Sequence, residues 1–144
     1  MGREDLAQDS DQARQSFTLL NDQQVYPARP ESAGQARSHA DSVMKRWHVV
    51  AEGLGSVVTE LVSNAIRHAG GNLSFSLRYD DDTVTVEVAD PSPALPALRS
   101  AMPLDPTGRG LVIVENFAHH WGVRAGRNGM GGKVVWAELE AHRA

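Results

Sequence analysis

The chain has 144 residues, a formal net charge of -4 and no cysteine. That length is enough for one domain with a single core and too short for two ordinary domains. The acidic balance argues against a protein whose main task is to bind nucleic acid directly through its phosphates, because such domains carry a clear excess of Lys and Arg. The absence of cysteine excludes disulfide frameworks, thiolate zinc sites and thiol nucleophiles.

The N-terminal segment lacks the features of a targeting signal. Its first residues, MGREDLAQDSDQ, do not show the basic and then apolar pattern of a secretion signal, and no apolar run approaches the roughly 20 residues that cross a bilayer. We therefore expect a cytoplasmic protein that does not associate with a membrane. Residues 1–14 are mostly polar, which predicts a disordered tail ahead of a folded domain over residues 15–144.

The first predicted elements are a short strand and two helices. The segment RQSFTLL, residues 14–20, favours a strand, and a helix is predicted from a candidate N-cap at Ser32 to about Trp47. A second helix begins near Ala51 and ends at Gly70, since glycine commonly follows a helix C-terminus. Apolar residues recur in it at spacings of three and four, which is the helical period: Leu54, Val57, Val58, Leu61, Ala65, Ile66 and Ala69.

An antiparallel hairpin and a long loop follow these helices. The segment NLSFSLRYDDDTVTVEVAD alternates apolar and polar residues on both sides of an Asp-rich turn. Prolines at positions 91, 93, 96, 103 and 106 then exclude regular structure, because each removes a backbone donor and restricts the residue before it. A loop of this length inside a compact domain is usually functional or mobile.

The last predicted elements are a helix and two strands. The helix is GRGLVIVENFAHH, the strands are WGVRAG and KVVWAEL, and GRNGMGG turns between them. This order of elements segregates helices from antiparallel strands. We therefore expect an α/β fold, a two-layer α/β sandwich with a mixed, mostly antiparallel sheet of about five strands and three helices on one face.

A polar column lies on the second predicted helix. Glu60, Asn64 and His68 recur every four residues, so their side chains lie nearly above one another, with Arg67 beside the end of the column. A solvated helix face is the ordinary explanation for such a column. The column is narrow, however, and residues 57–66 are otherwise heavily apolar, which favours the wall of a groove.

The residue types in this column suit phosphoryl chemistry. Asn64 can offer an oxygen to magnesium, which takes its other ligands from water and substrate phosphates. Glu60 can accept the proton of a hydroxyl group that attacks phosphorus. His68 and Arg67 can contact phosphate, or they can simply place positive charge at the helix C-terminus, where the dipole favours it.

Two further segments are consistent with a nucleotide site. TGRGLVIV places Gly108 and Gly110 at the start of a helix, where phosphate oxygens can approach free N–H groups, although an ordinary loop before a helix has the same pattern. VEVAD ends a predicted strand on Asp90, whose carboxylate could accept a hydrogen bond from an exocyclic amine such as that of adenine. A turn-initiating aspartate is the alternative for Asp90.

These segments, in this order, resemble the GHKL ATPase superfamily, in particular the anti-sigma factor serine/threonine kinases and related ATP-binding regulators of actinomycetes. The similarity spans about residues 17–139. ELVSNAIRHA resembles the N box of that family, VEVADPSP its G1 box and GRGLVIV its G2 box. Residues 91–107 take the place of its ATP lid, in a short form. The ordered set is more specific than any single box.

The resemblance implies a Bergerat-type ATP-binding fold with ATP and Mg²⁺ as cofactors. It makes Glu60 the general base and Asn64 the magnesium ligand. It also implies a homodimer and a small antagonist protein as partner, with a sigma factor as a possible second partner. The residues that would contact the nucleotide are Asn64, Arg67, His68, Asp90, Ser92, Gly108, Arg109, Gly110 and Leu111.

Two functions remain open from the sequence. The first is an ATP-dependent serine/threonine protein kinase that phosphorylates a small anti-sigma antagonist, and the presence of Glu60 favours it. The second is a binding module with a degenerate nucleotide pocket that sequesters a sigma factor or another signalling partner. The second function is favoured by Pro91 and Pro93. It is also favoured by Val134, because the family often has a threonine at that position.

A zinc enzyme is not expected from the sequence. The chain has six histidines, and none of them forms a recognisable ligand pair. His119 and His120 are adjacent in the sequence, which is not a ligand spacing typical of zinc enzymes.

Overall fold

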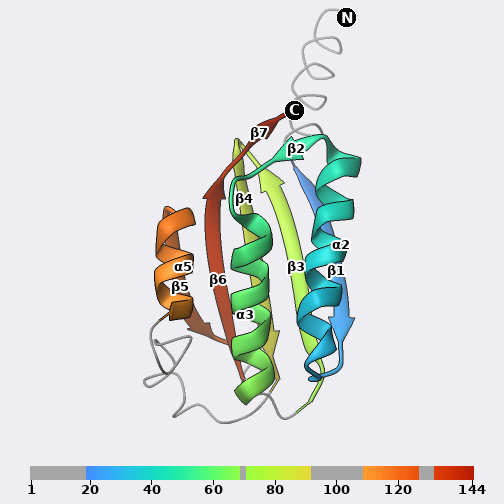
Figure 1. Ribbon diagram of the computed structural model, residues 1–144, viewed down its shortest axis with the longest axis vertical. Helices are drawn as coiled ribbons and strands as arrows, with labels where there is room; N and C mark the ends of the chain where they lie inside the picture. Colours follow the sequence, from blue (N-terminus) through green and yellow to red (C-terminus); the bar gives the residue numbers. More distant parts are fainter. Residues whose placement is uncertain (1–18, 69–70, 92–108, 127–131) are drawn as a thin grey trace, which may run out of the picture.

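The computed structural model describes residues 19–68, 71–91, 109–126 and 132–144, and these form two layers (Figure 1). One layer is a five-stranded sheet in the order β1-β3-β4-β6-β5, and the other consists of the helices, which cover one face of the sheet. The expected two-layer sandwich is confirmed. In chain order the elements are β1 (Leu20–Tyr26), α2 (Glu31–Trp47), β2 (Val49–Val50), α3 (Leu54–His68), β3 (Leu73–Asp80), β4 (Thr83–Asp90), α5 (Arg109–Phe117), β5 (His120–Ala125), β6 (Lys133–Glu140) and β7 (His142–Arg143).

Every pair of neighbouring strands in the large sheet is antiparallel within the described residues, whereas the sequence predicts a mixed, mostly antiparallel sheet. Two helices separate β1 from β3, so the chain returns to the sheet in the opposite direction. Among the described residues one helix, α5, lies between β4 and β5, and these two strands have the same direction because each is antiparallel to β6. They do not pair, because β6 lies between them.

The first strand lies further along the chain than predicted. Residues 14–18 of the predicted strand are outside the described residues, and β1 begins at Leu20. β1 is a polar edge strand without clear alternation, which is why the sequence does not predict it. Asp22 of β1 accepts a 2.6 Å hydrogen bond from Nε2 of His39 and lies 3.3 Å from a guanidinium nitrogen of Arg46, so α2 is tied to this edge.

The start of α2 also differs from the prediction. Ser32 is a helical residue and not the N-cap, which is Pro30 and makes no side-chain capping bond. The Ser32 hydroxyl instead donates a 2.6 Å hydrogen bond to the carbonyl oxygen of Pro27. Ser32 is fully buried, and this bond satisfies its hydroxyl group inside the protein.

The predicted hairpin is confirmed, and its turn has two residues. Asp80 pairs with Thr83, and Asp81 and Asp82 have φ values of 53° and 61°. Positive φ at both central residues is the type I′ geometry, whose twist matches that of the strands. The Tyr79 hydroxyl lies 3.3 Å from Oδ1 of Asp82, and burial together with this carboxylate raises the pKa of Tyr79.

A small sheet and a close contact between a ring and a glycine lie at the end of the sandwich where α3 begins. β2 and β7 form a small second sheet that the sequence does not predict, because two-residue strands have no readable pattern. α5 ends at Phe117, which is earlier than predicted. The ring of Phe117 packs against Gly53, just before the start of α3. A Cβ atom at Gly53, where φ is +80°, would lie 2.2 Å from that ring, so glycine is required there.

The core lies between α3 and the inner face of the sheet. Most of the predicted apolar stripe of α3 is buried, with Ile66 partly buried and Ala69 outside the described residues, and the inward residues of β3, β4 and β6 meet it. Such a stripe along one helix face is what an amphipathic helix buries. Among the described helices, none combines the length and the apolar character needed to span a bilayer. The side chains at the centre of this core are Val57, Val58, Leu61, Val62, Ala65, Phe75, Leu77, Val84, Val86, Val88, Val135, Ala137 and Leu139.

Leu61→Ala tests the position of α3 on the sheet. Leu61 is 0% exposed, so truncation should lower the free energy of unfolding by about 2–5 kcal/mol, measured by urea denaturation. Val112→Ala is the control, because Val112 on α5 is 55% exposed and its truncation should change stability by about 0.5 kcal/mol or less. Equal effects of the two substitutions would contradict the packing described above.

Candidate functional site

The described segments that carry predicted site residues meet at one end of the sandwich. The C-terminal end of α3, the C-terminal end of β4, the N-terminal end of β6 and the N-terminal end of α5 all lie at this end (Figure 1). These ends belong to segments that are up to about half the chain apart in sequence. The fold therefore brings together the segments that the sequence analysis selects separately.

Asn64 is the most unusual polar residue at this end. Its side chain is 0% exposed, and neither Nδ2 nor Oδ1 has a hydrogen-bond partner within the described residues. Leaving a buried polar group unpaired costs about 1–3 kcal/mol, so native proteins rarely retain one without a reason. This burial excludes solvation as the explanation for Asn64. It favours a ligand that pairs with the amide.

The remaining residues of the column have different environments. Glu60 lies one turn before Asn64, is half-buried and makes no hydrogen bond or ion pair to a described residue. Arg67 is exposed and takes part in an interaction of its own. His68 is the last residue of α3, and its side chain lies outside the described part of the structure. The carboxylate and the carboxamide thus remain adjacent on one helix.

Asp90 forms a buried ion pair with Lys133. The two residues are register partners at the ends of β4 and β6, with Nζ of Lys133 3.5 Å from Oδ2 of Asp90. Asp90 is 3% exposed and Lys133 5% exposed. Both are in phase with the buried Val88 and Val135, so they point toward the helix layer and share the face of the sheet that α3 covers.

Gly132 positions this pair. Its φ is +82°, and a Cβ atom at this position would lie 2.3 Å from the backbone oxygen of Asp90. A side chain at position 132 would therefore clash with the end of β4 as well as strain the backbone. Glycine lets β6 begin directly beside β4 and places Lys133 opposite Asp90.

The structure changes the role assigned to Val134. Val134 pairs with Ala89 and Arg124 and lies on the face of the sheet away from the helices. The side chain beside Asp90 is that of Lys133, which the sequence analysis does not select. Strand alternation could have identified it, because Lys133 is in phase with the apolar residues of KVVWAEL that face the core.

Several predicted site residues have limited or no description. Arg109, Gly110 and Leu111 form the first turn of α5, where the prediction expects phosphate contacts, and the environment of their side chains lies outside the described part. Ser92 and Gly108 lie outside the described residues, as does the predicted lid except for Pro91. The roles proposed for these residues stay predictions.

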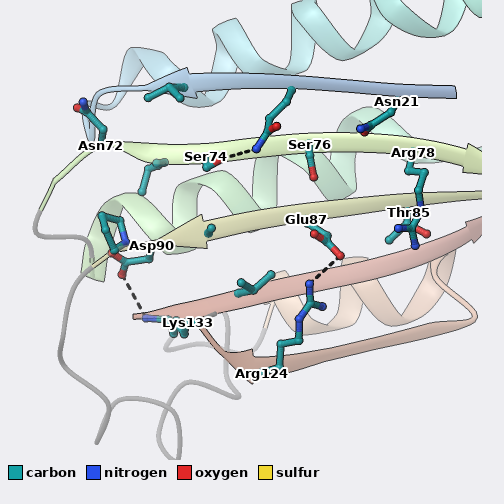
Figure 2. Close-up of a pocket in the computed structure, with 17 residues that line it drawn as sticks. Asn21, Asn72, Ser74, Ser76, Arg78, Thr85, Glu87, Asp90, Arg124 and Lys133 are labelled. Atoms are coloured by element: carbon teal, nitrogen blue, oxygen red, sulfur yellow. Dashed lines mark hydrogen bonds and ion pairs between the residues drawn. The ribbon is translucent and has the colours of Figure 1, made fainter. Parts of the chain in front are cut away.

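A large groove lies on the opposite face of the sheet (Figure 2). It has a volume of about 700 Å³ and a lining of both polar and apolar residues, which includes an ion pair between Arg124 and Glu87 with 2.9 Å between Nη2 and Oε2. Asp90 and Lys133 lie at one end of it, whereas Glu60 and Asn64 are not among its lining residues. The groove is therefore separate from the polar column of α3.

Lys133→Met tests the buried ion pair. This change removes the ammonium group, and the free energy of unfolding should fall by about 3 kcal/mol because Asp90 keeps a buried charge without that cation. Adding Asp90→Asn in the same chain should restore part of the loss, since an amide needs no counter-charge. Urea denaturation of the four proteins in this cycle measures the coupling. Additive effects would contradict the pairing.

The comparisons with known proteins agree with this arrangement. The family model described as histidine kinase-like ATPase domain matches residues 26–139, which include α3, the ends of β4 and β6 and the start of α5. A comparison with curated proteins found no match to the chain. Because the matched segment covers most of the sequence and every part of the site, the chain belongs to the histidine kinase-like ATPase domain family.

Proposed function

We propose that this chain binds Mg-ATP between α3, α5 and the ends of β4 and β6, and that it phosphorylates a serine or threonine of a small anti-sigma antagonist protein. The observation that supports this proposal most directly is the buried amide of Asn64, which has no partner among the described residues. Membership of the histidine kinase-like ATPase domain family supports nucleotide binding at the same place.

The amide of Asn64 fits a magnesium site. Mg²⁺ prefers oxygen ligands and uses few protein groups, because it keeps several waters and takes other ligands from phosphates. The amide oxygen would gain the partner that it lacks among the described residues, and the amide nitrogen could donate to a phosphate oxygen or to a water. The cost of burying this side chain would then be offset when the nucleotide is present.

The position of Glu60 supports its proposed role as the general base. It is half-buried on the same face as Asn64 and one turn away, so a hydroxyl group brought to the metal site would lie near its carboxylate. Bound Mg-ATP would supply the phosphoryl group, with ADP as the leaving group. Glu60 would take the proton of the attacking serine or threonine hydroxyl. Catalysis of this kind depends mainly on positioning and charge neutralisation.

The ion pair between Asp90 and Lys133 supports a second candidate function. A carboxylate that reads adenine must accept a hydrogen bond from its exocyclic amine, yet one oxygen of Asp90 lies 3.5 Å from the Lys133 ammonium. Nucleotide binding would have to share or displace that contact inside a buried site, which weakens affinity. The second function is a binding module that sequesters a sigma factor or another signalling partner through its surface, with a degenerate nucleotide pocket.

The partners belong to the proposal as well. The resemblance to anti-sigma kinases supports a homodimer that holds an antagonist protein and, in some states, a sigma factor. We propose this assembly for the kinase and, without phosphoryl transfer, for the binding module.

Asn64→Leu separates binding from stability. Leucine has a similar volume and no polar atoms in its side chain. The free energy of unfolding of the unliganded protein should therefore rise by about 1–3 kcal/mol, which appears as a higher unfolding temperature. The same substitution should abolish magnesium-dependent ATP binding, measured by isothermal titration calorimetry with and without Mg²⁺. A variant that binds Mg-ATP as tightly as the unaltered protein would contradict the role of Asn64.

Glu60→Gln separates binding from chemistry. The variant should still bind Mg-ATP, while formation of ADP from ATP should fall by at least about 100-fold because the base is lost. Glu115→Gln is the matched control, since Glu115 is an exposed glutamate on α5 and its substitution should leave ADP formation unchanged. If the unaltered protein neither binds Mg-ATP at millimolar concentration nor forms ADP, the kinase proposal fails and the binding module stands.

A further inference from the structure

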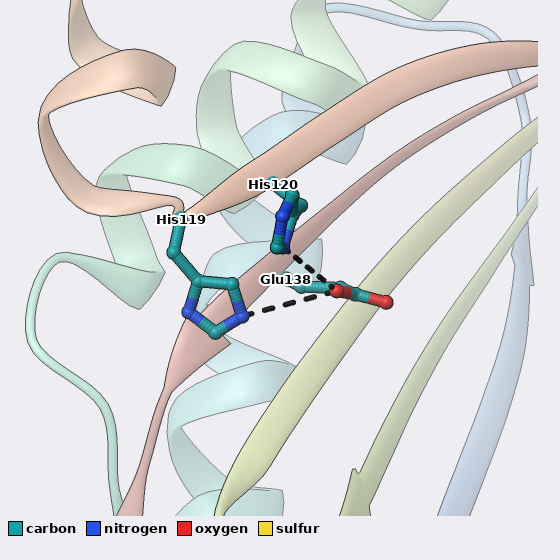
Figure 3. Close-up of side chains that lie close together, drawn as sticks. All are labelled: His119, His120 and Glu138. Atoms are coloured by element: carbon teal, nitrogen blue, oxygen red, sulfur yellow. Dashed lines mark ion pairs between the residues drawn. The ribbon is translucent and has the colours of Figure 1, made fainter.

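Three potential metal ligands converge at the end of β6 that lies away from the nucleotide site (Figure 3). Oε1 of Glu138 lies 3.8 Å from Nε2 of His119 and 3.6 Å from Nδ1 of His120. One donor atom from each of the three residues can be chosen so that all lie within 4.8 Å of one another. Two imidazoles and one carboxylate therefore face a common point.

The backbone holds this arrangement in place. α5 ends at Phe117, and the chain then turns into β5 so that His120 is the register partner of Glu138. The N–H group of His119 donates a 2.9 Å hydrogen bond to the carbonyl oxygen of Glu138. Both histidines are thus anchored to the same residue of β6. Adjacent histidines in a regular strand would point to opposite faces, and the turn before β5 removes that restriction.

The distances from Oε1 of Glu138 to the two imidazole nitrogens are closer to the spacing of ligands around a metal ion than to a direct hydrogen bond. Elsewhere in this chain, His39 contacts the carboxylate of Asp22 at 2.6 Å, as a direct hydrogen bond requires. The contacts of Glu138 are about 1 Å longer, beyond good hydrogen-bond distance. Ligands around a tetrahedral zinc ion, at about 2.0–2.2 Å from the metal, lie roughly 3.3–3.5 Å from one another.

The relative orientation of the two imidazole rings also suits a shared ligand position. The His119 and His120 rings meet edge to face, with their centroids 5.0 Å apart and an angle of 88° between their planes. They do not stack over each other, so a ring nitrogen of each is directed at Oε1 of Glu138. A small contraction of these contacts would complete a three-ligand site.

We infer that His119, His120 and Glu138 form a binding site for Zn²⁺ or a similar divalent transition-metal ion. Imidazole nitrogen with a carboxylate is a donor set that suits zinc, whereas Mg²⁺ prefers oxygen ligands alone. The His119 side chain is 41% exposed and that of His120 71%, so a fourth position stays open to water or to a ligand from outside.

The inferred zinc site is independent of the proposed nucleotide site. Glu138 lies five positions after Lys133 on β6, which corresponds to about 16 Å along the strand. Glu138 is also in phase with Val134, on the face of the sheet away from the helices. The inference therefore does not rest on ATP binding, and either proposal can fail without the other.

Titration of the full chain with ZnCl₂ tests the inference. In a buffer that does not chelate metals, with excess Mg²⁺ and no nucleotide, calorimetry should give one zinc ion per chain. His120→Ala and Glu138→Gln should each weaken zinc binding by at least about tenfold, because each removes one of only three ligands. His142→Ala is the matched control, since it removes an exposed histidine outside the cluster and should leave zinc affinity unchanged.

Replacing zinc with Co²⁺ gives a second readout. Visible absorption bands of a Co²⁺ complex with nitrogen and oxygen ligands should appear with the unaltered protein and be lost in Glu138→Gln, which retains the shape of the side chain. The inference is overturned if zinc does not bind at micromolar concentration. It is equally overturned if His120→Ala, Glu138→Gln and His142→Ala all bind zinc with unaltered affinity.

Discussion

The packing of α3 against the central strands is the contact on which the rest of the structure depends. Val58 and Leu61 are buried on the sheet, and this fixes the rotation of the helix about its own axis. Asn64 lies three residues after Leu61, on the same face, so the rotation that buries Leu61 also buries Asn64. The amide is held out of water by apolar contacts elsewhere in the helix. A site can therefore contain an unpaired polar group without unfolding the domain.

Strand β6 contributes one charged side chain to each of two separate clusters. The two clusters lie at opposite ends of the strand and on opposite faces of the sheet. Lys133, at the start, points toward the helices and pairs with Asp90. Glu138, near the other end, points to the opposite face and meets His119 and His120 at the start of β5. The alternation of side chains along a strand keeps the two groups apart. A nucleotide site and a metal site can thus share one strand without sharing ligands.

The Asp90 and Lys133 pair is central to the choice between the two proposed functions. A buried carboxylate needs either a cation or several hydrogen bonds, and here Lys133 supplies the cation from inside the protein. This arrangement stabilises the carboxylate in the absence of nucleotide. In the proposed nucleotide site, a base would therefore have to compete with this internal partner. An intact Glu60 and Asn64 beside such a pair is consistent with a site whose chemistry is retained and whose affinity for the base is reduced.

The sequence by itself determined the order of elements, the hairpin over residues 73–90 and the amphipathic α3, because each depends on a period of two or of three to four within one segment. It also selected Glu60 and Asn64 by their spacing of four on that helix, and Asp90 by its place at the end of a predicted strand before the proline loop. Only the tertiary structure decided that Asn64 is buried without a described partner, that Lys133 meets Asp90 and that Glu138 meets two histidines. The same is true of the polar β1 and the β2–β7 pair. These features arise from contacts between residues far apart in the chain, and local periodicity contains no information about which distant strand becomes a neighbour.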